Sequence, residues 1–416
     1  MLPDISLRSL RRNTVFLLLL FSPVLAAKPF PEQAAMDLSG GLASTPASAI
    51  PQIHFPAPAP VSASMRDFTP YTNWLRDEMQ EASVPGVAIA IVNSAGILDL
   101  QTWGVRDLDS QAPVEPDTIF RIASVSKTFA GTVASQLVDQ QLHSWDMPIV
   151  NILPQYSIGT DVSSQQMTLK HIMSHSSGLM PHAFSNMLDA GVAYEGIKAK
   201  FHEIPTVCPP GRCYGYQNVV FSLIADVVEV SMGTSYEDYV RDRIFGPLEM
   251  QRASMTLDDF RADPNASAPH QYRGNGQWGV STINPAYFTV GPASGINASV
   301  LDMIRWAQAN LGAMPEVLPH SVLAMQHTPV VETPRGSYFN RWPGMDRAWY
   351  GVGWRVFDYS GLRIIHHGGG VRGFRSELLL IPELDLGLVV MFNADTRLAN
   401  DVVPEFMSLL LSRTEH

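Results

Sequence analysis

The chain has 416 residues, of which 46% are hydrophobic and 16% charged, so it can bury a large core and hold two or three domains. Its 28 basic and 39 acidic residues give a net charge of −11. Because no basic run is longer than Arg11-Arg12, this balance argues against nucleic acids and anionic membranes as partners.

The first 27 residues have the pattern of a secretion signal. Basic residues precede the apolar run 15–21, and Ala26-Ala27 then offers a cleavage site. The run is too short for a membrane anchor, and Pro23 follows it closely. We therefore expect export to a bacterial periplasm, with no membrane anchor in the mature chain.

Residues 28–65 are rich in Ala, Pro and Ser, which is typical of a linker. The folded catalytic domain is expected over 66–416, beginning with a helix near 70–82. Two strands follow at 84–92 and 97–103, separated by a turn of sequence Asn-Ser-Ala-Gly.

Helices are predicted to dominate the middle of the chain, and strands to return near its end. The predicted helices include 168–175, 218–231, 235–243 and 302–311; the late strands are 350–357, 361–366, 375–381 and 386–392, followed by a helix at 399–412. The sheet would thus come from about 84–105 and 350–392, with a helical subdomain at about 130–310 inserted. This pattern predicts an α/β fold in one discontinuous domain.

Ser124 and Lys127 form a Ser-x-x-Lys motif. If Ser124 opens a helix, Lys127 lies on the same face one turn later, ~4.5 Å further along the axis. Burial lowers the pKa of a lysine, which can then take a proton from a neighbouring hydroxyl. Of the five lysines in the chain, only Lys127 has a serine three residues before it. Taken alone, such a motif is more often a capped helix start with a surface lysine.

Further motifs follow in a fixed order along the chain and resemble those of the serine β-lactamases and penicillin-binding-protein-like hydrolases, most closely the class C branch. They are Val84-Pro85-Gly86, Ser124 to Lys127, Leu142 to Pro148, His175 to Leu179, Pro210-Gly211 before Tyr216-Gln217-Asn218, and His366 to Gly370 with Gly373-Phe374. The resemblance runs from about residue 68 to the C-terminus. It implies a β-lactamase/DD-peptidase-like fold, with a central antiparallel sheet flanked by helices, and acyl transfer through Ser124 without a cofactor.

Tyr-x-Asn occurs three times, beginning at Tyr71, Tyr216 and Tyr338. Only the motif at Tyr216 follows a Pro-Gly turn and leads into an apolar helix, as in the family. The resemblance implies that Tyr216 transfers protons, since a phenolate is favoured beside a lysine ammonium. Asn218 would then hydrogen-bond Lys127 and the amide of the substrate.

The third family motif, a Lys-Thr-Gly strand, has the form His-x-Gly here, with His367 in the lysine position and Gly369 in the glycine position. The backbone N–H of Gly370 would join that of Ser124 in an oxyanion hole. Because histidine is only partly charged near neutral pH, binding of an anionic β-lactam is less well supported than acyl transfer. Arg372 and Arg375 would either supply that charge or be solvated.

Cys208 and Cys213 are the only cysteines, and they bracket a Pro-Pro-Gly-Arg turn. In an oxidising compartment a disulfide can close this turn, the alternative being two buried thiols. His171 and His175 stand four residues apart, but the glutamate of His-Glu-x-x-His is missing. No metal site is therefore expected.

The sequence thus predicts an exported serine hydrolase that opens β-lactams through an acyl-enzyme on Ser124, with a small molecule as substrate and a monomer as the expected state. A carboxylesterase or a D-amino-acid peptidase on the same scaffold is the alternative, because of His-x-Gly. A penicillin-binding sensor that is acylated without turnover is a third, less favoured interpretation.

Overall fold

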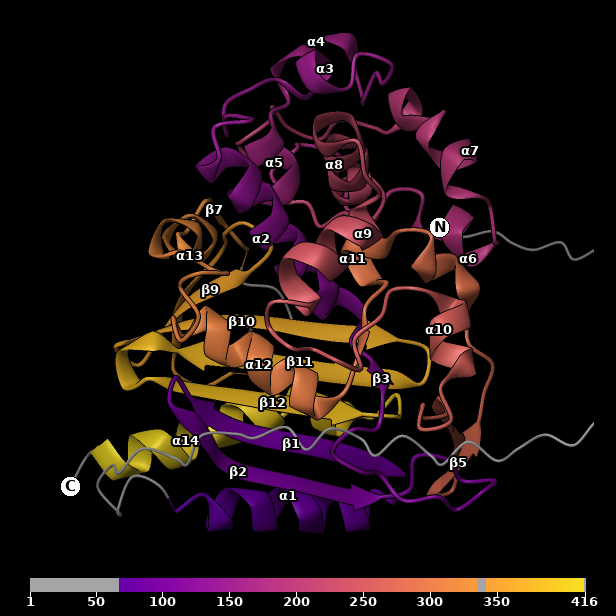
Figure 1. Cartoon of the computed structure of the whole chain (residues 1–416), viewed down its shortest axis with the longest axis vertical. Helices are drawn as coiled ribbons and strands as arrows, with labels where there is room; N and C mark the ends of the chain where they lie inside the picture. Colours follow the sequence, from indigo (N-terminus) through magenta and orange to yellow (C-terminus); the bar gives the residue numbers. More distant parts are fainter. Residues whose placement is uncertain (1–66, 335–341, 415–416) are drawn as a thin grey trace, which may run out of the picture. The chain divides into compact units, whose positions relative to one another are not determined.

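A computed structural model describes residues 67–334 and 342–414, so the predicted signal (1–27) and linker (28–65) lie outside the described residues. Its main feature is an eight-stranded antiparallel sheet with strand order β2-β1-β12-β11-β10-β9-β8-β7 (Figure 1). The strands are β1 Gly86–Asn93, β2 Gly96–Gly104, β7 Val331–Glu332, β8 Met345–Tyr350, β9 Arg355–Tyr359, β10 Leu362–Val371, β11 Phe374–Ile381 and β12 Leu386–Phe392. Two short ribbons pair β3 (Phe120–Arg121) with β6 (Asn297–Ala298) and β4 (His270–Gly274) with β5 (Gln277–Val280).

The two ends of the chain meet in this sheet. β1 pairs with β12 in an antiparallel register that places Val87 opposite Phe392 and Val92 opposite Gly387. The prediction that one sheet is drawn from both ends of the sequence is therefore confirmed.

Both faces of the sheet are buried. In β1, the odd-numbered residues of 87–91 pack in a core with α1 (Thr69–Glu81) and α14 (Val402–Thr414). The even-numbered residues of 88–92 join a second core, which contains α2 (Ser126–Asp139) and α12 (Val300–Asn310). Because β1 and β12 are buried on both faces, these two strands read as continuous apolar runs rather than as alternating ones.

Apart from the short strands β3 to β6, the chain between β2 and β7 consists mostly of helices and turns, as predicted. The α-helices are α3 Ile149–Ile152, α4 Asp161–Gln166, α5 Leu169–Met173, α6 Ser185–Asp189, α7 Tyr194–Lys198, α8 Ile224–Met232, α9 Tyr236–Val240, α10 Leu257–Ala262, α11 Gly291–Ser294 and α13 His320–His327. Figure 1 shows α3, α4, α5, α7 and α8 gathered on one side of the sheet, and α12 lying across it. Within 67–334 and 342–414, no helix has the length and apolar character that a membrane crossing requires.

The predicted strand 350–357 is wrong, because a turn interrupts it. β8 ends at Tyr350 and β9 begins at Arg355. Gly353, in the turn, has a φ of +75°, and a Cβ there would lie 2.3 Å from the carbonyl oxygen of Lys127. Glycine therefore lets this turn approach the backbone of α2 closely. Val352 and Trp354 in this turn are apolar, so the hydrophobicity pattern of the segment resembles that of a continuous strand.

Candidate active site

Ser124 lies in a 3₁₀ turn, and the α-helix itself begins two residues later at Ser126. The residue before it, Ala123, has a φ of +51°, a conformation that alanine rarely adopts. Hydrogen bonds from Ile122 N–H to the Ile296 carbonyl (3.1 Å) and from Ile296 N–H to Ser126 Oγ (3.0 Å) hold this turn. Ser124 is half-buried, which leaves its hydroxyl accessible at a rigid position.

Lys127 is fully buried, and its Nζ lies 3.4 Å from Ser124 Oγ, 2.8 Å from Asn218 Oδ1 and 2.9 Å from the carbonyl oxygen of Ala293. Burial lowers the pKa of Lys127 well below its ordinary value, and the positive charge of Arg355 lowers it further. A neutral amine has two N–H groups for the two carbonyl oxygens and one lone pair. That lone pair is then left for the hydroxyl of Ser124, which is the arrangement of a general base.

Tyr216 and Asn218 lie beside Lys127. The Nζ of Lys127 is 4.6 Å from the centroid of the Tyr216 ring. Because the lysine is held toward its neutral form, the permanent charge near this phenol belongs to Arg355, whose Cζ is 5.7 Å from the ring centroid. The structure thus brings these predicted residues together, and their roles stay predictions.

His175 packs against the ring of Tyr216. Its ring centroid lies 4.2 Å from that of Tyr216, and its Nδ1 accepts a hydrogen bond from the Gln217 N–H at 3.2 Å. Burial lowers the pKa of His175 well below its ordinary value, so it is neutral and fit to accept. In the part of the chain that the structure describes, no group of three or more His, Cys, Asp or Glu could hold a metal ion.

The two adjacent histidines of β10 point to opposite faces of the sheet, as the strand period requires. His366 lies in the α1–α14 face, where its Nε2 is 2.7 Å from Glu377 Oε2. His367 lies on the other face, and its Nε2 is 3.0 Å from the hydroxyl of Tyr350. Its Nδ1 is 2.8 Å from the Gly368 carbonyl, so Nδ1 carries the proton and Nε2 accepts from Tyr350.

His367 does not carry the partial charge expected from its type. Burial lowers its pKa well below the ordinary value, and the charge of Arg355 acts in the same direction. Near neutral pH this histidine is therefore a neutral hydrogen-bonding group. It fills the predicted position on β10 but does not replace the charge of the family's lysine.

β10 passes close to the nucleophile turn because Gly369 has no side chain. A Cβ on Gly369 would lie 2.1 Å from the Ile122 carbonyl oxygen and 2.4 Å from Ser376 Oγ. β9 pairs with β10 only as far as His366, so in the described residues the last part of that edge has no strand beside it. Gly370 follows there and is exposed, as an oxyanion-hole donor must be.

Arg355 is the site residue that the sequence analysis missed. It stands opposite His366 in the pairing of β9 with β10, and its Nη1 donates to the Tyr214 hydroxyl at 3.3 Å. Of the two candidates named instead, Arg372 is exposed, and Arg375 lies 3.6 Å from Glu377. Tyr214, Tyr216 and Lys127, which surround it, come from segments far from β9 in the sequence, so no local pattern marked it.

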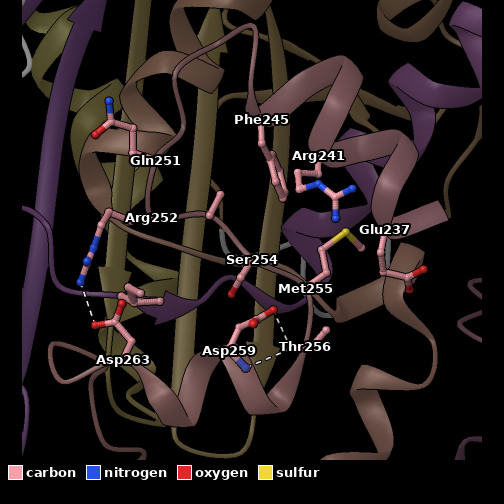
Figure 2. A pocket seen from close by; sticks show the side chains of 12 residues that line it. Glu237, Arg241, Phe245, Gln251, Arg252, Ser254, Met255, Thr256, Asp259 and Asp263 are labelled. Carbon is pink, nitrogen blue, oxygen red and sulfur yellow. Dashed lines mark hydrogen bonds and ion pairs between the residues drawn. The ribbon is translucent and has the colours of Figure 1, made fainter. Parts of the chain in front are cut away.

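A cavity of about 380 Å³ adjoins the end of β10. It is lined by Arg121, Asp189, Gln271, Asn284, Tyr287, Gly370, Val371, Arg372 and Asp395. Because it begins at Gly370, it offers space for a substrate group next to the predicted oxyanion hole. A separate cavity of about 360 Å³ contains none of the predicted site residues in its lining; Figure 2 shows Arg252 and Asp263 at one end and Glu237 and Arg241 at the other.

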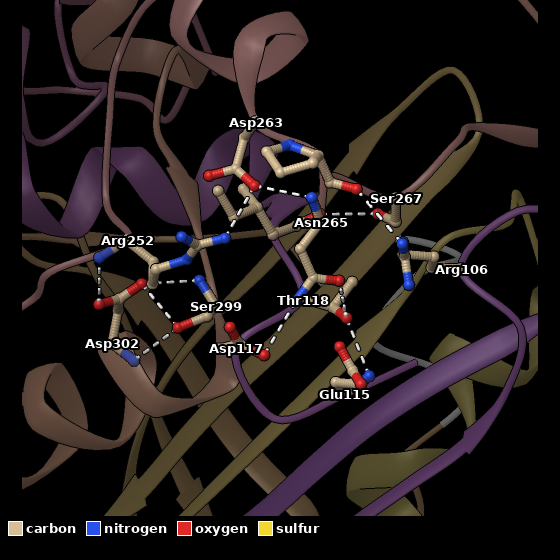
Figure 3. A network of polar contacts seen from close by, with 12 residues as sticks. Arg106, Glu115, Asp117, Thr118, Arg252, Asp263, Asn265, Ser267, Ser299 and Asp302 are labelled. Atoms are coloured by element: carbon tan, nitrogen blue, oxygen red, sulfur yellow. Dashed lines mark hydrogen bonds and ion pairs between the residues drawn. The ribbon is translucent and has the colours of Figure 1, made fainter. Parts of the chain in front are cut away.

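A polar network flanks β3, the strand that leads to the nucleophile turn (Figure 3). Arg252 pairs with Asp263 at 2.7 Å, and its backbone N–H donates to the buried carboxylate of Asp302 at 3.1 Å. Asn265 donates to Asp117 at 2.9 Å and accepts from Thr118 at the same distance. These bonds tie the segments on both sides of β3 together, which supports the position of Ser124.

Comparison with known proteins gives one family. A sequence model of the beta-lactamase family matches residues 72–406. The chain is 27% identical to a D-aminopeptidase of Cereibacter sphaeroides over 320 residues, covering 74% of this chain and 57% of that protein. It is 26% identical to penicillin-binding protein 4 of Amycolatopsis lactamdurans over 313 residues, covering 73% and 79%.

Among solved structures, the octameric penicillin-binding protein homologue from Pyrococcus abyssi has a TM-score of 0.74, at 21% identity, over 83% of this chain and 78% of that one. This likeness confirms the fold predicted from the sequence. The chain spans 57–63% of the length of several curated relatives that it matches, the D-aminopeptidase among them.

Proposed function

The chain belongs to the beta-lactamase family of serine hydrolases, and from this premise we propose that it is an exported, periplasmic enzyme that opens β-lactams through an acyl-enzyme on Ser124. The observation that carries the proposal is the buried Lys127, whose Nζ lies 3.4 Å from Ser124 Oγ and whose pKa is lowered by burial. A lysine held neutral beside a serine hydroxyl is equipped to activate it.

The proposed acylation begins when Lys127 takes the proton of Ser124 and Oγ attacks the carbonyl carbon of the lactam. The N–H groups of Ser124 and Gly370 bind the resulting oxyanion. The C–N bond then breaks, and Tyr216 delivers a proton to the leaving nitrogen. Lys127 then passes the proton it took from Ser124 to Tyr216, so that both groups regain their starting states. Water hydrolyses the ester: its hydroxyl bonds to the acyl carbon and its other proton goes to Ser124 Oγ, which releases the opened product.

Arg355 supports a substrate with a carboxylate near the reacting amide. It is the permanent cation beside Lys127, Tyr216 and His367, and it is half-buried, so that water screens its charge less than at the surface. The carboxylate of a penicillin or cephalosporin would meet this charge, whereas a neutral ester would not.

Hydrolysis of peptides that contain D-amino acids is the second candidate function. It is favoured by the neutral His367, which departs from the family's lysine, and by relatives named D-aminopeptidase. Such a peptide ends in a carboxylate as well, so Arg355 fits both substrates. Simple ester cleavage uses the same residues but gives Arg355 no substrate charge to bind.

Intact-mass spectrometry with a penicillin, a cephalosporin and a carbapenem, beside an absorbance assay of lactam loss, tests the proposal. We expect a transient adduct of lactam mass together with catalytic loss of at least one lactam. A lasting adduct without loss would indicate a sensor or peptidase. Neither adduct nor loss, with rapid cleavage of a D-amino-acid peptide or an ester, would refute the β-lactam assignment.

Replacement of Arg355 by glutamine should raise KM for anionic substrates by about 10- to 100-fold, the range for losing a hydrogen bond to a charged group. KM for a neutral ester should change little. Because Arg355 lowers the pKa of Lys127, its loss should also move the acidic limb of the acylation profile to higher pH. Arg76→Gln, at an exposed arginine of α1, is the matched control; equal KM values in Arg355→Gln and wild type would contradict a role in binding.

A further inference from the structure

A disulfide closes the loop that leads into the Tyr-x-Asn segment. Cys208 and Cys213 are joined, with their Cα atoms 6.4 Å apart. Cys213 directly precedes Tyr214 and stands three residues before Tyr216. The disulfide therefore fixes the start of the segment that carries Tyr216 and Asn218.

The closed loop is attached to the turn that begins at His175. Gly211 N–H donates to the Ser176 carbonyl at 2.7 Å, and Val207 N–H donates to the Gly178 carbonyl at 2.8 Å. Gly178 has a φ of +78°, and a Cβ there would lie 2.1 Å from the Cys208 carbonyl oxygen. The loop and the turn thus touch backbone to backbone, with no side chain between them to absorb a shift.

The same turn holds Tyr216 from its other side. Gly215 N–H donates to the His175 carbonyl at 2.7 Å, and the His175 ring lies against the tyrosine with a centroid distance of 4.2 Å. On the entry segment, the Tyr214 hydroxyl accepts from Arg355 at 3.3 Å. Movement of the loop would therefore displace both the phenol of Tyr216 and the guanidinium of Arg355.

We propose that the Cys208–Cys213 disulfide is a positioning element of the active site, which holds Tyr216 and Asn218 against Lys127 and keeps Tyr214 on Arg355. The inference rests on the proposed function of this site as an acylating centre. Both cysteines are half-buried, so a thiol reagent can reach them in the folded protein. The rate of acylation consequently depends on the oxidation state of this pair.

A disulfide that only stabilises the fold would behave differently. It would lower the unfolding temperature when removed but would leave the acylation rate and its pH dependence unchanged in protein that remains folded. A positioning disulfide changes both, because Tyr216 and Asn218 contact the groups that move protons. The pH profile of a folded variant therefore separates the two roles.

The test compares wild type with the Cys208→Ser/Cys213→Ser double variant, and wild type with and without dithiothreitol. Dithiothreitol supplies two electrons and two protons, so that the protein disulfide becomes two thiols while the reagent's own sulfurs join. Arg212→Ala, inside the loop at an exposed residue, keeps the disulfide and is the matched control. Circular dichroism and the unfolding temperature establish that each sample is folded.

We expect about a tenfold fall in kcat for the double variant and for reduced wild type, since a small misplacement of catalytic groups has an effect of this order or larger. KM should change less, and the pH profile should shift. Dithiothreitol should not affect the double variant. A folded double variant with the kcat and pH profile of wild type would overturn the proposal, as would a loss confined to samples that have unfolded.

A fluorophosphonate separates this inference from the proposed function, because it modifies an activated serine whatever the natural substrate is. Its phosphorus bonds to Ser124 Oγ, fluoride leaves, and the proton passes to Lys127. Wild type that reacts with this probe but opens no lactam would refute the substrate, and the probe rates of the variants would still test the disulfide. Wild type that fails to react would overturn both proposals.

Discussion

A variant with alanine in place of Ser124 should form no acyl-enzyme and should lose turnover by about 10⁴-fold or more, which is the scale on which removal of a nucleophile acts. The loss is this large because the variant has no nucleophilic oxygen at position 124. Within the structure's described ranges, Ser124 is the serine that Lys127 Nζ approaches, at 3.4 Å. Intact-mass spectrometry with a lactam and the absorbance assay measure the two effects together.

The fold should survive this change, since Ser124 is half-buried and its loss opens no core cavity. The unfolding temperature of Ser124→Ala is therefore expected to match that of wild type within a few degrees, as it does for most surface substitutions. Ser157→Ala, at an exposed serine, controls for handling and should retain full activity. Turnover by folded Ser124→Ala at the wild-type rate would assign the nucleophile elsewhere.

The second large effect is expected at Lys127, where methionine should reduce acylation by about 10³-fold, within the range of general acid–base catalysis. Replacement of Lys127 by arginine tests whether the lysine acts as a base or only as a cation. It keeps a positive charge but cannot accept a proton, so Lys127→Arg should be as inactive as Lys127→Met if the lysine is the base. Substantial activity in Lys127→Arg would show instead that the site needs only a cation there.

Stability measurements give an independent test of the protonation state of Lys127. In the unfolded chain the lysine binds a proton up to its ordinary pKa of 10.5, whereas in the folded chain burial lowers the pKa. Between those two pKa values the unfolded state holds more protons, so the free energy of unfolding rises with pH. Lys127→Met removes this contribution, and urea unfolding should show a shallower rise below pH 10.5 than in wild type. Equal slopes would mean that Lys127 keeps its proton on folding.

Elements that follow a local sequence pattern could be predicted from the sequence alone. The strand at 84–92, the helix at 70–82 and the late strands near 375–381 and 386–392 were predicted within a few residues, because apolar runs and turn residues bound them. The pairing of Ser124 with Lys127 followed from spacing along a helix. Tyr216 was separated from two incidental matches by its flanking residues.

Features that depend on contacts between distant segments could not be read in the same way. The neutrality of His367 depends on burial beneath Tyr350 and on the charge of Arg355, neither of which is visible in the residue type. Arg355 itself belongs to the site through its contacts with Tyr214 and Tyr216, which lie on a segment far from β9 in the sequence. The 3₁₀ turn at Ser124 reflects the contact of Ile122 with Ile296, which no local pattern contains.

The pairing of β1 with β12 dictates an order of events during folding. A chain emerging from its N-terminus presents β1 and β2 as a two-stranded hairpin, which is marginally stable in water by itself. The neighbour of β1 on the other side is β12, close to the end of the sequence. The hairpin therefore gains this partner strand only after almost the whole chain has been synthesised. Closing so long a loop slows folding. The pairing of β1 with β12 is thus the last in the sheet to form, and a chain released before Leu386 would keep an unpaired apolar edge along β1.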